Sequence, residues 1–139
     1  MSSEPRSRAG KIVNSVFERL QRGDLDALLA LYTPACTFVD MASGETSSGT
    51  DALRLLLVDY WTGLPDFRVA EAQFIEADPL VVVELVLQGT HRGTFLGYPA
   101  TGRQIRWRAC AVYSIDPDRN LVNTEAYYYD SQTLRDQLA

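Results

Sequence analysis

The chain has 139 residues, of which 46% are hydrophobic and 22% charged, and its formal net charge is −5. This length suits about one globular domain, and the acidic balance without a run of Lys and Arg argues against nucleic acid and anionic membranes as partners. No stretch approaches the ~20 apolar residues of a membrane span. The opening MSSEPRSRAGK lacks the apolar segment of a secretory signal, so we expect a cytoplasmic protein.

The cysteine and histidine content predicts no metal site. Cys36 and Cys110 lie in apolar, strand-like runs, where we expect buried free thiols. The only histidine is His91, and no Cys-x-x-Cys spacing occurs, so a structural zinc site is not expected. Because no Gly-rich phosphate loop stands out either, the sequence predicts no cofactor.

In the first half of the chain, apolar residues recur with the period of an α-helix. Residues 1–8 are polar and predict a flexible N-terminus, and residues 9–139 predict a single domain. One apolar face marks a helix up to Gly23: Ile12, Val13, Val16, Phe17 and Leu20. Asp24 is a cap for a second helix over 25–32, which Pro34 ends. A third helix begins near Thr50 and ends before Gly63 and Pro65.

After Asp66 the period changes from helical to the alternation of strands. Strand-like runs cover residues 67–77, 80–91, 103–115 and 121–129, separated by the turn sequences DP, GYPATG and DPDRN. One short strand lies between the second and third helices. Helices first and strands later predict an α+β fold, with a mostly antiparallel sheet packed on three N-terminal helices.

Several segments resemble the SnoaL-like polyketide cyclases and the bacterial ketosteroid isomerases of the nuclear transport factor 2-like superfamily. The segments that carry the resemblance, in order, are GDLDALLALYTPACTFVD, SSGTDAL, LPDFRV, GTHRGTFLGYPATGR and LVNTEAYYYDSQTLRDQL. The resemblance spans residues 11–139. It implies a cone-shaped fold, in which a strongly curved sheet wraps around the helices and forms a deep apolar pocket.

The resemblance transfers only one catalytic position unchanged. Asp40, before the loop MASGETSSG, matches the base of the isomerases. Their two enolate-stabilising positions fall on Val16 and Ala111, and the catalytic aspartate of the cyclases falls on Tyr127. The Asp-Arg-Asp set of the limonene-type epoxide hydrolases falls near Ala111, Ala109 and Tyr127.

Two interpretations of Asp40 remain open at this point. Its side chain can bond the backbone two residues on and stabilise a turn, or it can be a general base in an apolar pocket. On the last predicted strand, alternation alone would bury Val122 and the residues on the same face of the strand. The resemblance instead turns Glu125 and Tyr127 toward the pocket. His91 continues the apolar face of the strand predicted over 80–91, so we expect it at the pocket rim.

The predicted pocket suits a bulky apolar ligand. Ala109 and Ala111 leave space on a strand that also carries aromatic residues. The predicted substrate-binding residues are Phe17, Tyr32, Phe38, Trp61, Trp107 and Tyr113.

These features predict a cofactor-independent isomerase, cyclase or dehydratase acting on a polyketide- or terpenoid-like substrate. Asp40 would be the base, and Tyr127, Tyr113 or His91 would donate a hydrogen bond to the developing oxyanion. Glu125 would be a second carboxylate, which also allows epoxide hydrolysis. The alternative is a non-catalytic binding or dimerisation domain.

We also expect a homodimer or higher homo-oligomer. Both parities of the last two strands carry large side chains, more than one core can use. The expected contact is the outer sheet face, with Arg106, Arg108, Val122 and Tyr128 at or near it.

Overall fold

A computed structural model describes residues 2–139 and shows the α+β fold that the sequence predicts. Four helices and six strands follow one another along the chain: α1 (Arg8–Arg22), α2 (Leu25–Leu29), β1 (Tyr32–Asp40), β2 (Thr46–Ser48), α3 (Thr50–Gly63), β3 (Arg68–Ala77), β4 (Leu80–Thr90), β5 (Gln104–Asp116), β6 (Leu121–Tyr129) and α4 (Ser131–Leu138).

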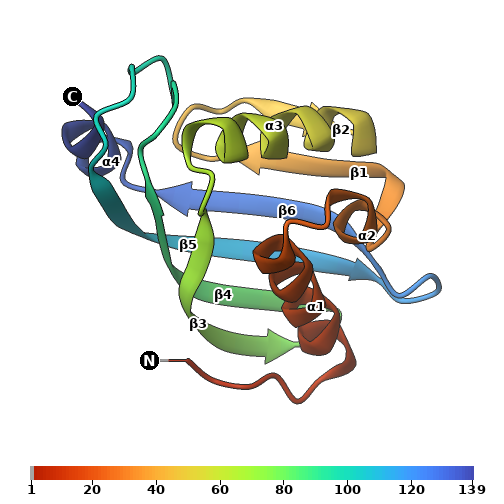
Figure 1. Ribbon diagram of the computed structural model, residues 1–139. Coiled ribbons are helices and arrows are strands. Elements are labelled where there is room, and N and C mark those ends of the chain that lie inside the picture. The colour runs from red at the N-terminus through yellow and green to blue at the C-terminus, as the bar shows by residue number, and fades with distance from the viewer. Residues whose placement is uncertain (1) are drawn as a thin grey trace.

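The strands form one curved sheet in the order β2-β1-β6-β5-β4-β3. Only β1 and β6 pair in parallel, and all the other neighbours are antiparallel. Helices α1, α2 and α3 lie over one face of this sheet (Figure 1). The hydrophobic core fills the space between these helices and the inner face of the strands.

The second helix is shorter than predicted. Asp24 caps α2 as expected, accepting a hydrogen bond from the amide of Ala27 at 3.1 Å. The helix ends at Leu29 rather than Tyr32, because Tyr32 already pairs with Val122 in the sheet. Pro34 lies inside β1, where the register with β6 is irregular and a missing amide donor is tolerated.

Two short elements were not predicted from the sequence. Strand β2 forms from part of the loop after Asp40 and pairs with residues 37–39 of β1. Helix α4 begins after Asp130, whose carboxylate accepts from the amides of Gln132 and Thr133. This helix buries Leu134 and Leu138 and packs against β5.

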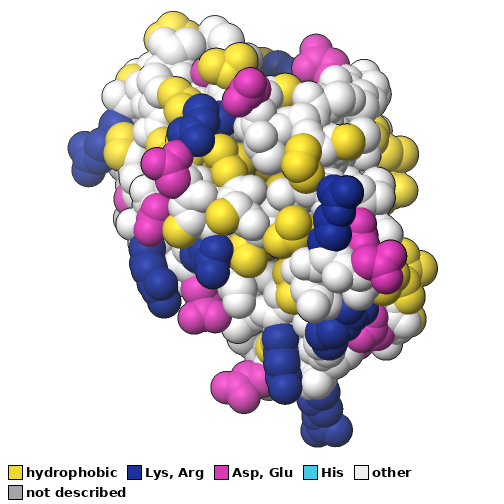
Figure 2. Space-filling model, turned by 90° about the vertical axis from the view of Figure 1, so that its right-hand side faces the viewer, with side chains coloured by type: hydrophobic (Ala, Val, Ile, Leu, Met, Phe, Trp, Pro, Cys, Tyr) yellow, Lys and Arg dark blue, Asp and Glu magenta, His cyan; other side chains and the backbone are white. Residues whose placement is uncertain are grey.

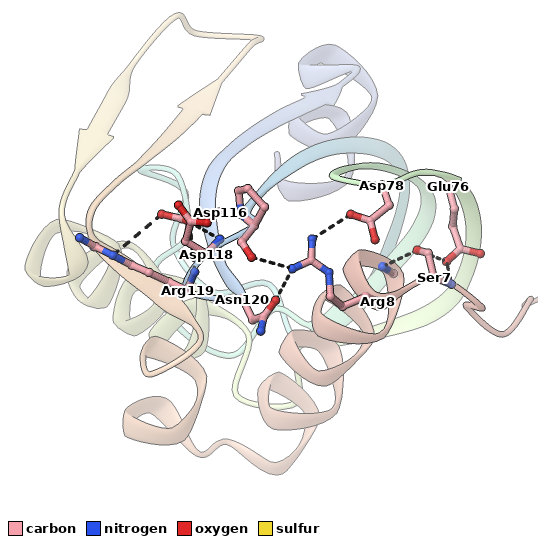
Figure 3. A network of polar contacts seen from close by, with 10 residues as sticks. Ser7, Arg8, Glu76, Asp78, Asp116, Asp118, Arg119 and Asn120 are labelled. Atoms are coloured by element: carbon pink, nitrogen blue, oxygen red, sulfur yellow. Dashed lines mark hydrogen bonds and ion pairs between the residues drawn. The ribbon is translucent and has the colours of Figure 1, made fainter.

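A polar network holds the start of α1 against the two hairpin turns at one end of the sheet (Figure 3). The Arg8 guanidinium donates to the Pro117 carbonyl and to Asp78, each at 3.0 Å, and also to Asn120. Glu76 accepts from the Ser7 hydroxyl at 2.6 Å. The backbone of residues 2–7, predicted to be flexible, lies along β3, where the Ser3 amide donates to the Ala72 carbonyl.

The surface carries both signs of charge. Figure 2 shows acidic, basic and hydrophobic side chains interspersed on one side of the molecule. Within residues 2–139, no helix has the length and apolar character that crossing a bilayer requires.

Candidate active site

A cavity of about 80 Å³ lies between the helices and the inner face of the sheet, and we call it the inner cavity. Its walls come from α1, α2, α3 and all strands except β2. Its lining residues are Val16, Phe17, Leu20, Leu28, Tyr32, Phe38, Leu53, Leu56, Leu57, Tyr60, Phe67, Val69, Leu85, Leu87, Ala111, Tyr113, Glu125 and Tyr127. Among these described lining residues, one carboxylate and four phenols are the polar side chains on an otherwise apolar surface.

A bulge in β6 turns Glu125 and Tyr127 into this cavity. Ile115 pairs with Val122 and Ser114 pairs with Thr124, so Asn123 is an extra residue on β6. The extra residue reverses the alternation, and both Val122 and the later Glu125 face inward. Val122 is fully buried on the inner side, so its expected place on the outer sheet face was wrong.

Among the described residues 2–139, Glu125 is the only carboxylate that lines the inner cavity. The Tyr32 hydroxyl donates to its Oε1 at 2.7 Å, and Tyr113 brings a second phenol to the carboxylate. Burial among apolar side chains disfavours the charged form and raises the pKa of Glu125 to about 7, although hydrogen bonds from the two phenols oppose this rise. The carboxyl can therefore gain or lose a proton near neutral pH.

The two phenols beside Glu125 remain protonated. Burial, followed by the nearby Glu125 charge, raises the pKa of Tyr32 and of Tyr113 well above the ordinary value. Each tyrosine therefore stays a neutral hydrogen-bond donor over the pH range in which Glu125 titrates.

The hydroxyl group of Tyr127 is held in place by a group that can only donate a hydrogen bond. The Trp107 indole nitrogen donates to the Tyr127 hydroxyl oxygen at 2.7 Å, and an indole N–H cannot accept. The hydroxyl proton of Tyr127 must therefore point elsewhere, and Tyr60 is its neighbour on the cavity wall. Burial raises the pKa of Tyr127 well above its usual range, so this group also remains a donor.

Asp40 lies outside the inner cavity. Its Oδ1 accepts from the amides of Ala42 and Ser43 at 2.9 and 3.0 Å, and its Oδ2 accepts from the Tyr129 hydroxyl at 2.9 Å. The first two bonds are those of a turn-stabilising aspartate. Asp40 instead borders a second cavity of about 400 Å³, which we call the outer chamber. The two predicted carboxylates thus do not line one space.

His91 lies away from both cavities. It is completely buried, with Nδ1 2.9 Å from the Thr101 hydroxyl and Nε2 3.1 Å from the Tyr98 carbonyl. Both contacts join His91, which directly follows β4, to residues further along the loop between β4 and β5. The geometry gives His91 a structural environment and no access to a ligand in the inner cavity.

The predicted substrate-binding residues divide into two groups. Phe17, Tyr32, Phe38 and Tyr113 line the inner cavity. Trp107 lies behind two lining residues: its indole donates to the Tyr127 hydroxyl, and its ring stacks on Phe67 with centroids 6.0 Å apart. Trp61 packs against the core but lines neither cavity.

Tyr60 is a site residue that sequence analysis missed. It lines the inner cavity and the outer chamber, and its ring packs edge-on against Phe67 and Phe95. In the sequence, Tyr60 fits the apolar face of α3, and no pattern indicates that its hydroxyl lies near that of Tyr127. Among residues 2–139, no group of three or more His, Cys, Asp and Glu side chains is placed to hold a metal ion.

Comparison with known families assigns the chain to a class. The sequence matches the family model of the SnoaL-like polyketide cyclases over residues 11–138. The chain therefore belongs to this family, as its sequence motifs predict. Among curated proteins, none matches the chain.

Solved structures show the same fold at low sequence identity. A candidate polyketide cyclase from Xanthomonas campestris pv. campestris has a TM-score of 0.86 and 22% identity, covering 95% of this chain and 97% of that chain. One from Pseudomonas putida has a TM-score of 0.84 and 20% identity, covering 97% and 100%. IdmH from Streptomyces antibioticus, also a candidate polyketide cyclase, has a TM-score of 0.80 and 19% identity, covering 95% and 99%.

Proposed function

We propose that this protein is a cofactor-independent acid–base enzyme, of cyclase or isomerase type, which acts on a polyketide-like ketone with Glu125 as the proton-transfer group. Membership of the SnoaL-like family supports the reaction class. The observation that carries the proposal is the single carboxylate facing an apolar cavity, hydrogen-bonded by Tyr32 at 2.7 Å.

The first step is removal of a proton from the carbon beside a substrate carbonyl. The Glu125 carboxylate takes the proton, the C–H electron pair forms the C=C bond of an enolate, and the carbonyl electrons move onto oxygen. A general base works best when its pKa lies near the working pH, and Glu125 has a pKa of about 7. The apolar lining keeps water away from the reacting carbon.

The second step returns the proton, so the protein ends as it began. In an isomerisation of a β,γ-unsaturated ketone, the enolate is a dienolate, and protonated Glu125 delivers the proton to its γ-carbon, so the C=C bond moves into conjugation with the carbonyl. In an aldol cyclisation, the enolate carbon attacks a second carbonyl carbon of the same substrate, and the resulting alkoxide takes the proton from Glu125. No electrons leave the substrate in either case, so no redox partner is required.

We assign to Tyr127, which lines the inner cavity together with Glu125, the role of donor to the enolate oxygen. Its oxygen already accepts from Trp107, so its own proton is directed away from the indole. A fixed donor in an apolar site stabilises developing negative charge more strongly than water does. Asp40 has no part in this mechanism, because its oxygens hold a turn and the Tyr129 hydroxyl.

Hydrogen exchange on a simple ketone tests this proposal without knowledge of the natural substrate. The protein is incubated with butanone, a ketone small enough for the inner cavity, in D₂O at pD 7.5, and deuterium incorporation beside the carbonyl is followed by NMR. Glu125→Gln should lower the protein-catalysed rate by about 10²–10⁴-fold, as loss of a general base does. Asp40→Asn is the matched control and should retain the rate. A wild-type protein that binds the ketone without accelerating exchange would instead be a binding protein.

A further inference from the structure

Two neighbouring strands form the wall of the inner cavity that joins the proposed base to the proposed donor. Between β5 and β6, Tyr113 pairs with Glu125 and Ala111 pairs with Tyr127, and all four residues line the cavity. Side chains directly opposite each other in an antiparallel pair have Cβ atoms about 4.5–5.5 Å apart. A ketone that reaches both Glu125 and Tyr127 therefore lies beside Ala111.

Ala111 has the smallest side chain among the described residues that line the inner cavity, because every other one is valine or larger. It is only 1% exposed, so its methyl group borders the cavity and not the solvent. Ala109 precedes it by two residues on the same face of β5 and is also buried, but it does not line the cavity. The space on this wall therefore comes from Ala111, although the sequence predicted it for Ala109 as well.

The aromatic rings on either side of Ala111 are packed against further rings. Tyr113 meets Phe17 edge-on, with ring centroids 6.1 Å apart. Tyr127 stacks on Tyr129, with ring centroids 4.6 Å apart. Because protein interiors are close-packed, these neighbours fix the positions of both rings and thereby the width of the space over Ala111.

The inner cavity is also small as a whole. Its volume is about 80 Å³. An engineered protein cavity that binds benzene measures about 150 Å³. In an apolar pocket, one methylene more or less changes binding by about 10–200-fold, so a small change in this wall has a large effect on which ligand fits.

We infer that Ala111 determines the size of the ketone that the site accepts: the space over its methyl group holds the carbonyl substituent that faces β5 and admits only a short, unbranched one. The substrate class is then a methyl or ethyl ketone. This inference rests on the proposed function for the position of the ketone between Glu125 and Tyr127, whereas the size limit itself requires no catalysis.

Two substitutions of Ala111 change this space in opposite directions. Ala111→Val narrows it, and Ala111→Gly widens it by one methyl group. Ala109→Val is the matched control, because it makes the same change on the same face of β5 outside the cavity. Binding of three symmetrical ketones (acetone, 3-pentanone and 2,4-dimethyl-3-pentanone) to each protein is measured by ligand-observed NMR titration, and folding is verified by circular dichroism.

The inference expects Ala111→Val to weaken 3-pentanone binding relative to acetone binding by at least about tenfold, whereas Ala109→Val keeps the wild-type ratio. Ala111→Gly should raise the affinity for the branched ketone relative to 3-pentanone by about fourfold, as room for one further methyl group does. If Ala111→Val does not fold, the ratio measured for Ala111→Gly decides.

An unchanged ratio in a folded Ala111 variant, or an equal loss in Ala109→Val, would overturn the inference, as would a wild type that does not bind 3-pentanone. The outcome for the proposed function is separate. Proteins that show this size dependence but catalyse no hydrogen exchange would refute the role of Glu125 and leave the inference on Ala111 standing.

Discussion

Replacing Glu125 with Gln should stabilise the protein at high pH and have little effect at low pH. The variant keeps the shape of the side chain and an oxygen that can accept from Tyr32, but it carries no charge. In the wild type, burial raises the pKa of Glu125 from its ordinary value of 4.5 to about 7. The charged carboxylate therefore opposes folding, and the amide does not.

The size of the effect follows from these two values. A difference of this magnitude corresponds to about 3 kcal/mol of unfolding free energy. Below pH 4.5 the group is protonated in the folded and the unfolded chain, and the penalty is absent. The penalty grows as the pH rises from there and is complete slightly above 7. For a chain of 139 residues, about 3 kcal/mol corresponds to roughly 10 °C in Tm.

Thermal melts of wild type and Glu125→Gln between pH 4.5 and 8.5 measure the difference directly. The midpoint of the variant relative to the wild type should rise by about 10 °C across this range. Altered contacts between the amide that this substitution introduces and Tyr113 would shift the melting midpoint by the same amount at every pH. They therefore do not affect the trend with pH. Glu84→Gln, at an exposed position of β4, is the control and should show no such trend. A difference that does not change with pH would refute the burial of an ionisable Glu125.

Three further predictions concern the surroundings of the site. Tyr127→Phe leaves the buried Trp107 indole N–H without its acceptor and should cost about 1–3 kcal/mol in urea unfolding, whereas Tyr128→Phe should cost little; equal effects would refute the buried hydrogen bond. Asp40→Asn should lower stability by about 0.5–2 kcal/mol, because an amide cannot accept from both the turn amides and Tyr129; an unchanged melting point would contradict the turn role. We also expect a dimer through the outer sheet face, where Tyr128 is exposed, and a light-scattering mass of 15.5 kDa would exclude it.

The fold was largely predictable because the apolar residues follow the helical period in the first half of the chain and the alternation of strands in the second half. Apolar spacing placed α1 and α3, and alternation placed β3 to β6. The boundary between α2 and β1 was misplaced, since Leu28, Leu29 and Tyr32 suit a helix and a buried strand alike. Strand β2 was not predicted, because its three residues are polar, show no apolar alternation and are ordered by pairing with β1.

The site was predictable only in part, and a backbone irregularity explains why. The inward orientation of Glu125 came from the family resemblance, because alternation along β6 favoured the opposite face. The extra residue Asn123 reverses that alternation, and no local sequence signal marks it. The sequence also left both interpretations of Asp40 open, and only the bond lengths to Ala42 and Ser43 favour the turn.

The central claim is that Glu125 transfers a proton in an apolar cavity, and deuterium exchange on butanone tests it most directly. The protein-catalysed rate in D₂O should follow an apparent pKa near 7, as the carboxyl ionises. Glu125→Gln should abolish this catalysed exchange while leaving butanone affinity unchanged, and Asp40→Asn should preserve both. Exchange that persists in Glu125→Gln, or that is lost in Asp40→Asn with its fold intact, would contradict the assignment of Glu125 as the base.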